Sequence, residues 1–509
     1  MQYSLRLDPE RQIGTVHPMV FGHFIEHLGR CIYGGVYEPG SPLADARGFR
    51  TDVLEAVKTI GVPILRWPGG NFASNYHWED GIGPVDKRPA RFDLAWRSVE
   101  PNTFGTEEFL AFCDALSTDK QTCEPYVCLN TGTGTLDEAV RWLEYCNLDS
   151  DQYPTHHARW RRQLGRTEPY RVKYWGIGNE VYGAWQVGHS TAAAYADKCV
   201  QYARFLKAVD PGVKLIAVGA DDPDWDLEVL KRAGTVIDYL SIHQYWGRDD
   251  HYGTVAAAHE VERRLKLLSS VVDVAEGILQ PDRPIEISFD EWNVWYRGRN
   301  RPWEEFYALK DGLFAAGAFN AMYRQCKRVT MANLAQMVNA LGMLHTTPTA
   351  LVKSPIYHVF DLYANHTGRT VLAAAATPDD DAARQTISAN VAVTPYGRPE
   401  PRPRMVKGVP YVDAVATIDG SPENPTRVSI AAVNRHATDR ASLRLDLGVL
   451  TRALSGRRLH LHELTGPDPM QQNTLEHPDA VTPTTRALDS LPPSLDLSPR
   501  SVAVLEWVR

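Results

Sequence analysis

The chain has 509 residues and a formal net charge of −8. Single hydrophobic cores stop growing at roughly 250–300 residues, so this length predicts more than one domain. An acidic chain is a poor match for a polyanion, so we do not expect nucleic acid as a partner, and a neutral ligand fits better.

The first ten residues lack the basic start and the apolar stretch of a secretory signal. No apolar run approaches the ~20 residues that a membrane-spanning helix needs, so no membrane partner is expected. Seven cysteines, an odd number, suit a reducing compartment in which they are buried thiols. Their spacing contains no CxxC pair, which argues against structural zinc. Together these features predict a cytoplasmic protein.

Eight apolar segments recur along the first two thirds of the chain, with stretches of helical spacing between them. They are the segment that ends at residues 24–26 and residues 63–67, 126–130, 173–178, 214–218, 239–243, 285–289 and 330–334. Helical spacing is clearest over residues 52–60, 106–116 and 191–209. This alternation predicts an α/β fold, a (β/α)8 TIM barrel that spans residues 15–365.

After about residue 365 the pattern changes to short alternating runs separated by Pro, Gly and Asp. The clearest runs are residues 369–375, 386–393, 411–418, 427–433 and 501–508. They predict an all-β sandwich, of jelly-roll type, over residues 366–509, and the alternation of residues 2–7 predicts that residues 1–14 add a strand to it. Twelve of the 13 tryptophans lie at or before Trp303, which places the expected site in the barrel.

Two segments, residues 174–180 and 285–292, each read as a buried strand that ends on a carboxylate, Glu180 or Glu291. These glutamates are 111 residues apart (291 − 180), which equals three strand–helix units of 37 residues. In a parallel barrel both would emerge at the C-terminal face from strands three apart. Two carboxylates that face each other across a pocket are typical of a retaining glycosidase.

Asp290 is a rival for the role of Glu291. Neighbouring side chains of a strand point in opposite directions, so only one of the two is expected to face the centre of the pocket. A bland alternative for either glutamate is a structural ion pair with an arginine. The loop at residues 76–84 and the insertion before Phe104 are expected to wall off a closed pocket, whereas an open groove would bind a continuous chain.

Five motifs extend this interpretation: residues 21–27 (FGHFIEH), 65–72 (LRWPGGNF), 76–84 (YHWEDGIGP), 174–180 (YWGIGNE) and 289–296 (FDEWNVWY). In this order they resemble the α-L-arabinofuranosidases of glycoside hydrolase family 51. The resemblance implies a retaining, exo-acting enzyme of the clan A type that removes terminal α-L-arabinofuranosyl groups from arabinoxylan- or arabinan-derived oligosaccharides. It also implies a hexamer, with no metal or organic cofactor.

The same resemblance implies roles for individual residues. Glu180 matches the general acid/base and Glu291 the nucleophile. The matching substrate-binding set is Glu26, Arg66, Asn71, Asn179, His243, Tyr245, Trp295 and Gln336, with Trp96 as a weaker candidate. Structural pairing competes for Arg66 and Glu26, and a plain core role competes for His243.

Two other functions stay open at this point. Clan A barrels share the two glutamates, so a β-xylosidase or an endo-β-glucanase is the alternative within enzymes. A barrel that only binds sugar is the alternative outside enzymes, and the presence of both carboxylates disfavours it.

Overall fold

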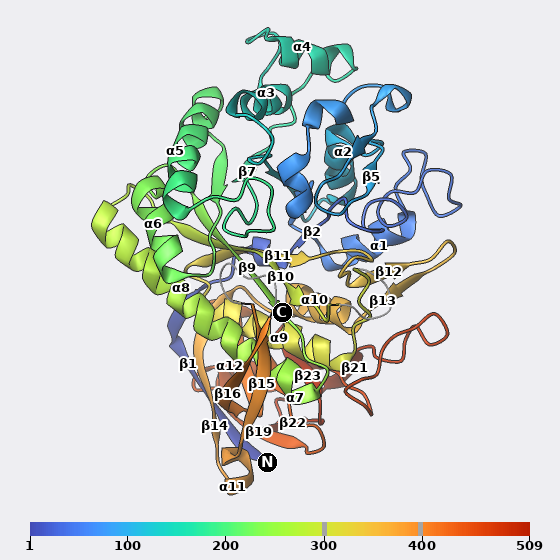
Figure 1. Ribbon diagram of the computed structural model, residues 1–509. Coiled ribbons are helices and arrows are strands. Elements are labelled where there is room, and N and C mark those ends of the chain that lie inside the picture. The colour runs from blue at the N-terminus through green and yellow to red at the C-terminus, as the bar shows by residue number, and fades with distance from the viewer. Residues whose placement is uncertain (298–302, 395–400) are drawn as a thin grey trace.

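The computed structural model describes residues 1–297, 303–394 and 401–509. Eight parallel strands close into a barrel, which confirms the predicted TIM barrel and each of its strands. They are β2 (Gly22–Phe24), β3 (Ile64–Trp67), β6 (Glu124–Cys128), β7 (Tyr174–Ile177), β8 (Lys214–Ala217), β9 (Tyr239–Trp246), β10 (Glu286–Val294) and β11 (Val329–Ala335). The barrel and most of its helices form the upper half of the molecule in Figure 1.

Helices surround the barrel and bury their apolar faces on it. They are α1 (Thr51–Ile60), α2 (Thr106–Leu116), α3 (Leu136–Asn147), α4 (His156–Gln163), α5 (Ala192–Val209), α6 (Pro223–Ala233), α7 (His251–Val255), α8 (Ala257–Leu279), α9 (Leu309–Arg324) and α10 (Pro355–His366). Local sequence fixes several boundaries: Thr135 and Glu138 form a capping box at the start of α3, and Asp222 caps α6. The predicted helical segments at residues 52–60, 106–116 and 191–209 correspond to α1, α2 and α5.

The N-terminal end of the barrel is filled by its own side chains. Ile64, Tyr174 and Tyr239, each the first residue of its strand, pack in one cluster with Met19 and Met331. All are at least 92% buried. Because this end is packed, a ligand can enter only from the opposite face, where the strands end.

The lower half of Figure 1 is a mostly-β domain built on one nine-stranded sheet. Its order is β21 (Thr484–Leu488), β20 (Leu459–Leu464), β23 (Ser501–Val508), β18 (Pro425–Asn434), β17 (Val412–Gly420), β14 (Thr370–Pro378), β1 (Gln2–Thr15), β19 (Ala441–Asp446) and β22 (Ser494–Leu497). Edge strand β22 also contacts β18 and β23, so the sheet curls around a single apolar core. The N-terminal strand β1 lies between β14 and β19.

One predicted strand of this domain lies elsewhere. Strand β15 (Thr386–Val393) pairs only with β16 (Arg402–Pro410), and this hairpin packs on β9 and α7 of the barrel. The buried side chains of Ile387 and Val391 belong to the core of the barrel and not to that of the curled sheet. The run at 386–393 was therefore a correct strand prediction with the wrong partner.

Smaller elements complete the described chain. They are the 3-10 turns η1 (Pro18–Phe21), η2 (Asn71–Asn75), η3 (Trp78–Gly81) and η4 (Val85–Lys87), the hairpins β4 (Arg91–Phe92) with β5 (Val99–Glu100) and β12 (Leu344–Thr346) with β13 (Leu351–Lys353), and α11 (Asp381–Arg384) and α12 (Leu450–Leu454).

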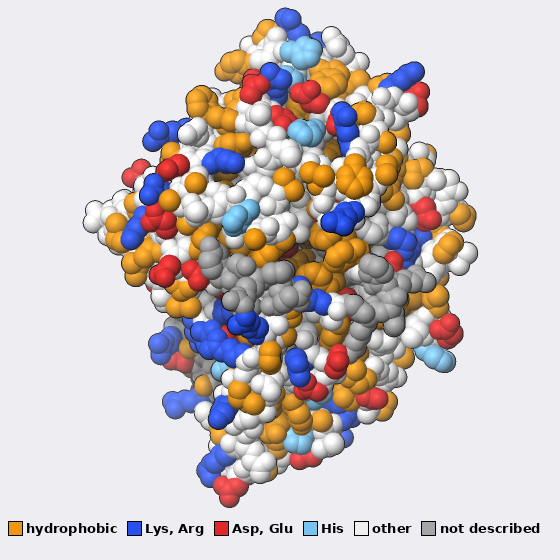
Figure 2. Space-filling view, in the orientation of Figure 1, with side chains coloured by type: hydrophobic (Ala, Val, Ile, Leu, Met, Phe, Trp, Pro, Cys, Tyr) orange, Lys and Arg blue, Asp and Glu red, His pale blue; other side chains and the backbone are white. Residues whose placement is uncertain are grey.

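The seven cysteines are all buried free thiols, as expected from their sequence context. Within the described ranges, no helix combines the length and the apolar character that crossing a membrane requires. Acidic and basic side chains are both present across the face shown in Figure 2, over the barrel and over the sheet domain.

Candidate active site

The two predicted catalytic glutamates reach the C-terminal face of the barrel by different routes. Glu291 lies within β10, three residues before its end, and Glu180 lies in the loop three residues after β7. Glu180 also has a positive φ of 40°. The prediction that each glutamate ends its strand was therefore wrong in detail, although both reach the same pocket.

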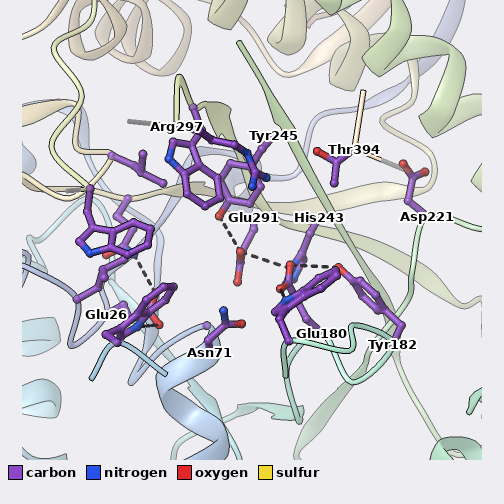
Figure 3. A pocket seen from close by; sticks show the side chains of 18 of the residues that line it. Glu26, Asn71, Glu180, Tyr182, Asp221, His243, Tyr245, Glu291, Arg297 and Thr394 are labelled. Carbon is purple, nitrogen blue, oxygen red and sulfur yellow. Dashed lines mark hydrogen bonds and ion pairs between the residues drawn. The ribbon is translucent and has the colours of Figure 1, made fainter. Parts of the chain in front are cut away.

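The two carboxylates converge on His243, which lies within β9. A ring nitrogen of His243 and one carboxylate oxygen of each glutamate lie within 4.8 Å of one another. His243 Nδ1 is 3.0 Å from Glu180 Oε1 and 3.4 Å from Glu291 Oε2. Figure 3 shows the histidine beside both carboxylates. The separation of the two glutamates is thus short enough for both to act on one bond.

Two further groups hold Glu291 in place. Arg66 Nη1 donates to Oε1 at 2.6 Å, and the Tyr245 hydroxyl donates to Oε2 at 2.7 Å. The second amino group of Arg66 donates to Asn179 Oδ1 at 2.7 Å, and Asn179 in turn donates to Asn71 Oδ1 at 3.2 Å. Because Arg66 is 1% exposed and paired with Glu291, it orients that carboxylate.

Asp290 does not line the pocket, in agreement with the expectation that only one of the two neighbouring carboxylates faces its centre. The register of β10 shifts between Ser288 and Glu291, so its neighbouring side chains do not simply alternate. Asp290 accepts from the Tyr126 hydroxyl at 2.7 Å and lies 3.3 Å from His243 Nε2. It stays inside the barrel wall, and only Glu291 lines the pocket.

Glu180 accepts three hydrogen bonds. The donors are the Tyr182 hydroxyl at 3.1 Å, Trp185 Nε1 at 3.0 Å and His243 Nδ1 at 3.0 Å. Burial alone would raise the pKa of Glu180, but these donors and the charge of His243 hold it below its ordinary value. Burial opposes protonation of His243 as well, yet the carboxylates around it raise its pKa to about 10.

Glu26 occupies the other side of the pocket. It accepts from the Phe72 backbone N–H at 3.1 Å, from Trp96 Nε1 at 3.0 Å and from Gln336 Nε2 at 3.0 Å. Burial, with a contribution from the charge of Glu291, raises the pKa of Glu26 to about 8. A Cβ atom on Gly70 would lie 2.9 Å from Glu26 Oε2, so a glycine is needed for this approach.

Aromatic rings form the wall between Glu26 and Glu291. Trp96 and Trp303 meet edge to face with centroids 4.7 Å apart, Trp303 lies 5.9 Å from Trp295, and Trp295 lies 5.5 Å from Tyr245. The enclosed cavity has a volume of about 210 Å³. Such apolar faces with convergent polar groups suit a single sugar ring.

Nine of the eleven predicted site residues line this cavity. They are Glu26, Asn71, Trp96, Glu180, His243, Tyr245, Glu291, Trp295 and Gln336. Arg66 and Asn179 lie directly behind them, as supports of Glu291 and Asn71.

The sequence interpretation missed several lining residues, among them Tyr182, Trp185, Asp221, Arg297, Trp303 and Thr394. Most stand on loops after strands, and Thr394 follows β15, outside the predicted barrel. Trp185 could have been suspected, since it is an aromatic residue five positions after Glu180. The insertion before Phe104 supplies Trp96 to the wall of the pocket, as expected. The loop at residues 76–84 supplies no lining residue, so that part of the expectation was wrong.

Two groups of side chains have metal-ligating atoms close together in the described part of the chain. One is Glu180, His243 and Glu291, and the other is His366, His462 and Glu506 at the junction of α10 with the curled sheet. In both groups the carboxylates already accept hydrogen bonds from protein donors, such as Tyr245 in the first.

Comparison with known proteins agrees with this geometry. Residues 56–263 match a family model described as the α-L-arabinofuranosidase 1 domain, and residues 290–501 match the α-L-arabinofuranosidase C-terminal domain. "Alpha-L-arabinofuranosidase C" of Emericella nidulans is 42% identical over 467 residues, which cover 87% of each chain. "Intracellular exo-alpha-(1->5)-L-arabinofuranosidase" of Streptomyces lividans is 39% identical over 365 residues, 67% of this chain and 54% of the relative.

A solved structure described as the "thermostable GH51 alpha-L-arabinofuranosidase" from Thermotoga petrophila superposes with a TM-score of 0.88 at 43% identity. The match covers 99% of this chain and 100% of the other. The matches thus extend through both the barrel and the mostly-β domain. The chain is a member of the α-L-arabinofuranosidases of glycoside hydrolase family 51.

Proposed function

We propose that this protein is a retaining, exo-acting α-L-arabinofuranosidase in which Glu291 is the nucleophile and Glu180 the general acid/base. The observation that carries the proposal is the placement of their carboxylate oxygens within 4.8 Å of each other at the mouth of one cavity. Retaining glycosidases hold their two carboxyl groups about 5–5.5 Å apart, whereas inverting enzymes leave room for a water molecule.

In the first step Glu291 attacks the anomeric carbon, and a proton from Glu180 passes to the departing oxygen. In the second step Glu180 takes a proton from water, which attacks the same carbon and releases Glu291. Arg66 and Tyr245 hold the carboxylate of Glu291 in position for the attack. Asn71, Gln336 and Glu26 line the cavity with groups that can bind the hydroxyls of the sugar.

His243 supplies the proton that Glu180 needs. The raised pKa of His243 and the lowered pKa of Glu180 favour a protonated His243, whose Nδ1 lies 3.0 Å from Glu180 Oε1. Transfer along that hydrogen bond turns Glu180 into an acid as the leaving oxygen approaches. Once Glu291 is bound to the sugar its charge is lost, so the attraction that holds a proton on His243 weakens.

The cavity volume supports exo action. About 210 Å³ is small beside the roughly 300–1,000 Å³ of sites for larger ligands. Trp96, Trp295 and Trp303 border it on the Glu26 side, so the terminal sugar meets a wall there and a chain cannot continue past it.

Finer properties belong to the same proposal. We propose short arabinan- or arabinoxylan-derived oligosaccharides as substrates, an intracellular location as in the name of the Streptomyces relative, and a hexameric assembly. Domain limits of 15–365 and 366–509, with residues 1–14 joined to the second domain, suit the position of β1 in the curled sheet. Size-exclusion chromatography with light scattering tests the assembly.

The decisive test is release of nitrophenol from 4-nitrophenyl α-L-arabinofuranoside by the wild type, Glu180→Ala and Glu291→Ala, with and without azide. Azide should rescue Glu180→Ala with an azide product of retained configuration and Glu291→Ala with one of inverted configuration. Activity on a β-xyloside or β-glucan in place of the arabinofuranoside would keep the roles and overturn the substrate. The opposite pattern of azide products would exchange the roles.

A further inference from the structure

The wall of the cavity on the Glu180 side differs in chemistry from the wall on the Glu26 side. It consists of Trp185, Asp221 and Thr394, and in Figure 3 Asp221 and Thr394 lie on the side of His243 and Tyr182, opposite Glu26. The departing oxygen must meet the carboxyl of Glu180, since that group protonates it. The leaving group therefore extends toward this wall.

Trp185 supplies an apolar face beside the acid. Its ring packs on Gly183, where an added Cβ would lie 2.4 Å from the ring, and its Nε1 donates to Glu180 at 3.0 Å. The ring is half-buried and lines the cavity. Such a fixed indole suits the C–H face of a second sugar ring.

Asp221 supplies a fixed hydrogen-bond acceptor. It follows β8 with a positive φ of 55°, and its carboxylate is held by an ion pair with Arg264 and by Gln244 Nε2 at 3.3 Å. Its side chain is 10% exposed and reaches the cavity. A carboxylate held in this way can accept from sugar hydroxyls without reorganising.

Thr394 comes from the β15–β16 hairpin, which is C-terminal to the barrel. Its Oγ1 is buried and accepts or donates no hydrogen bond among the described residues, although the side chain lines the cavity. The hairpin is tied to this wall by charges, because Arg404 Nη1 lies 3.0 Å from Glu260 Oε1 and Glu260 lies 3.6 Å from Arg264, the partner of Asp221. These ion pairs thus connect the hairpin to the wall of the cavity.

We propose that Trp185, Asp221 and Thr394 form the subsite for the leaving group, and that it selects a hydroxyl-bearing sugar over an aryl or alkyl alcohol. Trp185 stacks on the sugar ring, and Asp221 and Thr394 bind its hydroxyls. Thr394 makes the hairpin beyond the barrel a determinant of specificity. The inference rests on the proposed arabinofuranosidase activity.

The test compares two substrates, an α-(1→5)-linked arabinofuranosyl disaccharide and 4-nitrophenyl α-L-arabinofuranoside, with Thr394→Val and Asp221→Asn. Each variant should raise KM for the disaccharide about tenfold more than KM for the aryl substrate, since only the disaccharide offers hydroxyls to this wall. The control Thr386→Val lies at the exposed start of the same hairpin and should leave the ratio of the two KM values at its wild-type value. Equal effects on both substrates would overturn the proposal.

A second measurement needs no variant. With 4-nitrophenyl α-L-arabinofuranoside as donor, millimolar xylobiose should compete with water for the glycosyl-enzyme and yield transfer products, and equimolar ethanol should not. Equal transfer to xylobiose and ethanol would overturn the subsite. A wild type that does not cleave the aryl arabinofuranoside would instead refute the proposed function itself.

Discussion

Arg66 Nη1 lies 2.6 Å from Glu291 Oε1, and this contact joins β3 to β10 inside the barrel. The same guanidinium donates to Asn179, which stands directly before Glu180. One buried cation therefore binds both Glu291 and the residue directly before Glu180. The burial of Arg66 would lower its pKa, but the charges of Asp290 and Glu291 raise it well above its ordinary value.

Replacement of Arg66 by lysine should lower kcat about 10²–10³-fold, because an ammonium group cannot bridge Glu291 and Asn179 in fixed geometry. The measurement is steady-state kinetics on the aryl arabinofuranoside, with circular dichroism to confirm folding. Arg232→Lys, on the surface of α6, is the matched control. A folded Arg66→Lys enzyme with wild-type kcat would show that the bridge has no catalytic part.

Glu26→Gln should stabilise the protein increasingly as the pH rises from about 4.5 to 8. Burial raises the pKa of Glu26 to about 8, so in this window the native state holds a proton that the unfolded chain has lost, and the wild type loses stability as the pH rises. Glutamine has no such proton. Unfolding in urea at pH 5 and pH 8 measures the difference, with exposed Glu55→Gln as control. A constant difference between the two pH values would contradict the raised pKa.

His243→Gln should lower kcat for the α-(1→5)-linked disaccharide at least 10-fold more than it lowers kcat for 4-nitrophenyl α-L-arabinofuranoside. General acid catalysis contributes about 10²–10⁴-fold, and a nitrophenolate leaves without much help from a proton. The effect should lie in kcat, whereas substitutions at Asp221 and Thr394 are expected to change KM. Exposed His460→Gln is the control. Equal losses on the two substrates would assign His243 an orienting role only.

Glu506→Gln should destabilise the fold at pH 7 and have little effect near pH 2. Although burial opposes it, hydrogen bonds from His366 and His462, with Arg427 nearby, lower the pKa of Glu506 to about 2. The stabilisation is present above the ordinary pKa of 4.5 and is lost as the pH falls toward 2, and the shift corresponds to about 3 kcal/mol.

Urea unfolding of Glu506→Gln and of exposed Glu10→Gln at pH 7 and pH 3 checks this. A loss of stability that is the same at both pH values would assign the effect to packing.

The sequence predicted the barrel and the pairing of Glu180 with Glu291 because both depend on local signals. Buried strands and capped helices show in the order of residues, and the spacing of 111 residues reflects the repeating unit. The contacts of Asp290 with Tyr126 and His243 were not predictable in this way, since they accompany a register shift in β10 that appears only in the packed barrel.

The wall on the Glu180 side of the cavity could not be predicted for a different reason. Trp185 and Asp221 stand on irregular loops, and Thr394 arrives from a hairpin more than 200 residues away from Glu180 in the sequence. Strand composition showed that residues 386–393 are extended, but which sheet an extended segment joins depends on tertiary packing. The five sequence motifs likewise include none of these three residues.

The central position of β1 in the curled sheet has a consequence for biosynthesis. This strand leaves the ribosome before the barrel does, but its neighbours β14 and β19 are complete only after residues 378 and 446 have been made. Throughout translation of the barrel, a strand with buried Leu5 and Leu7 stays unpaired. Pairing of β1 with β14 and β19, which are distant in sequence, is expected to be a slow step during which the chain can aggregate. The second domain therefore completes its sheet only when β1 is inserted.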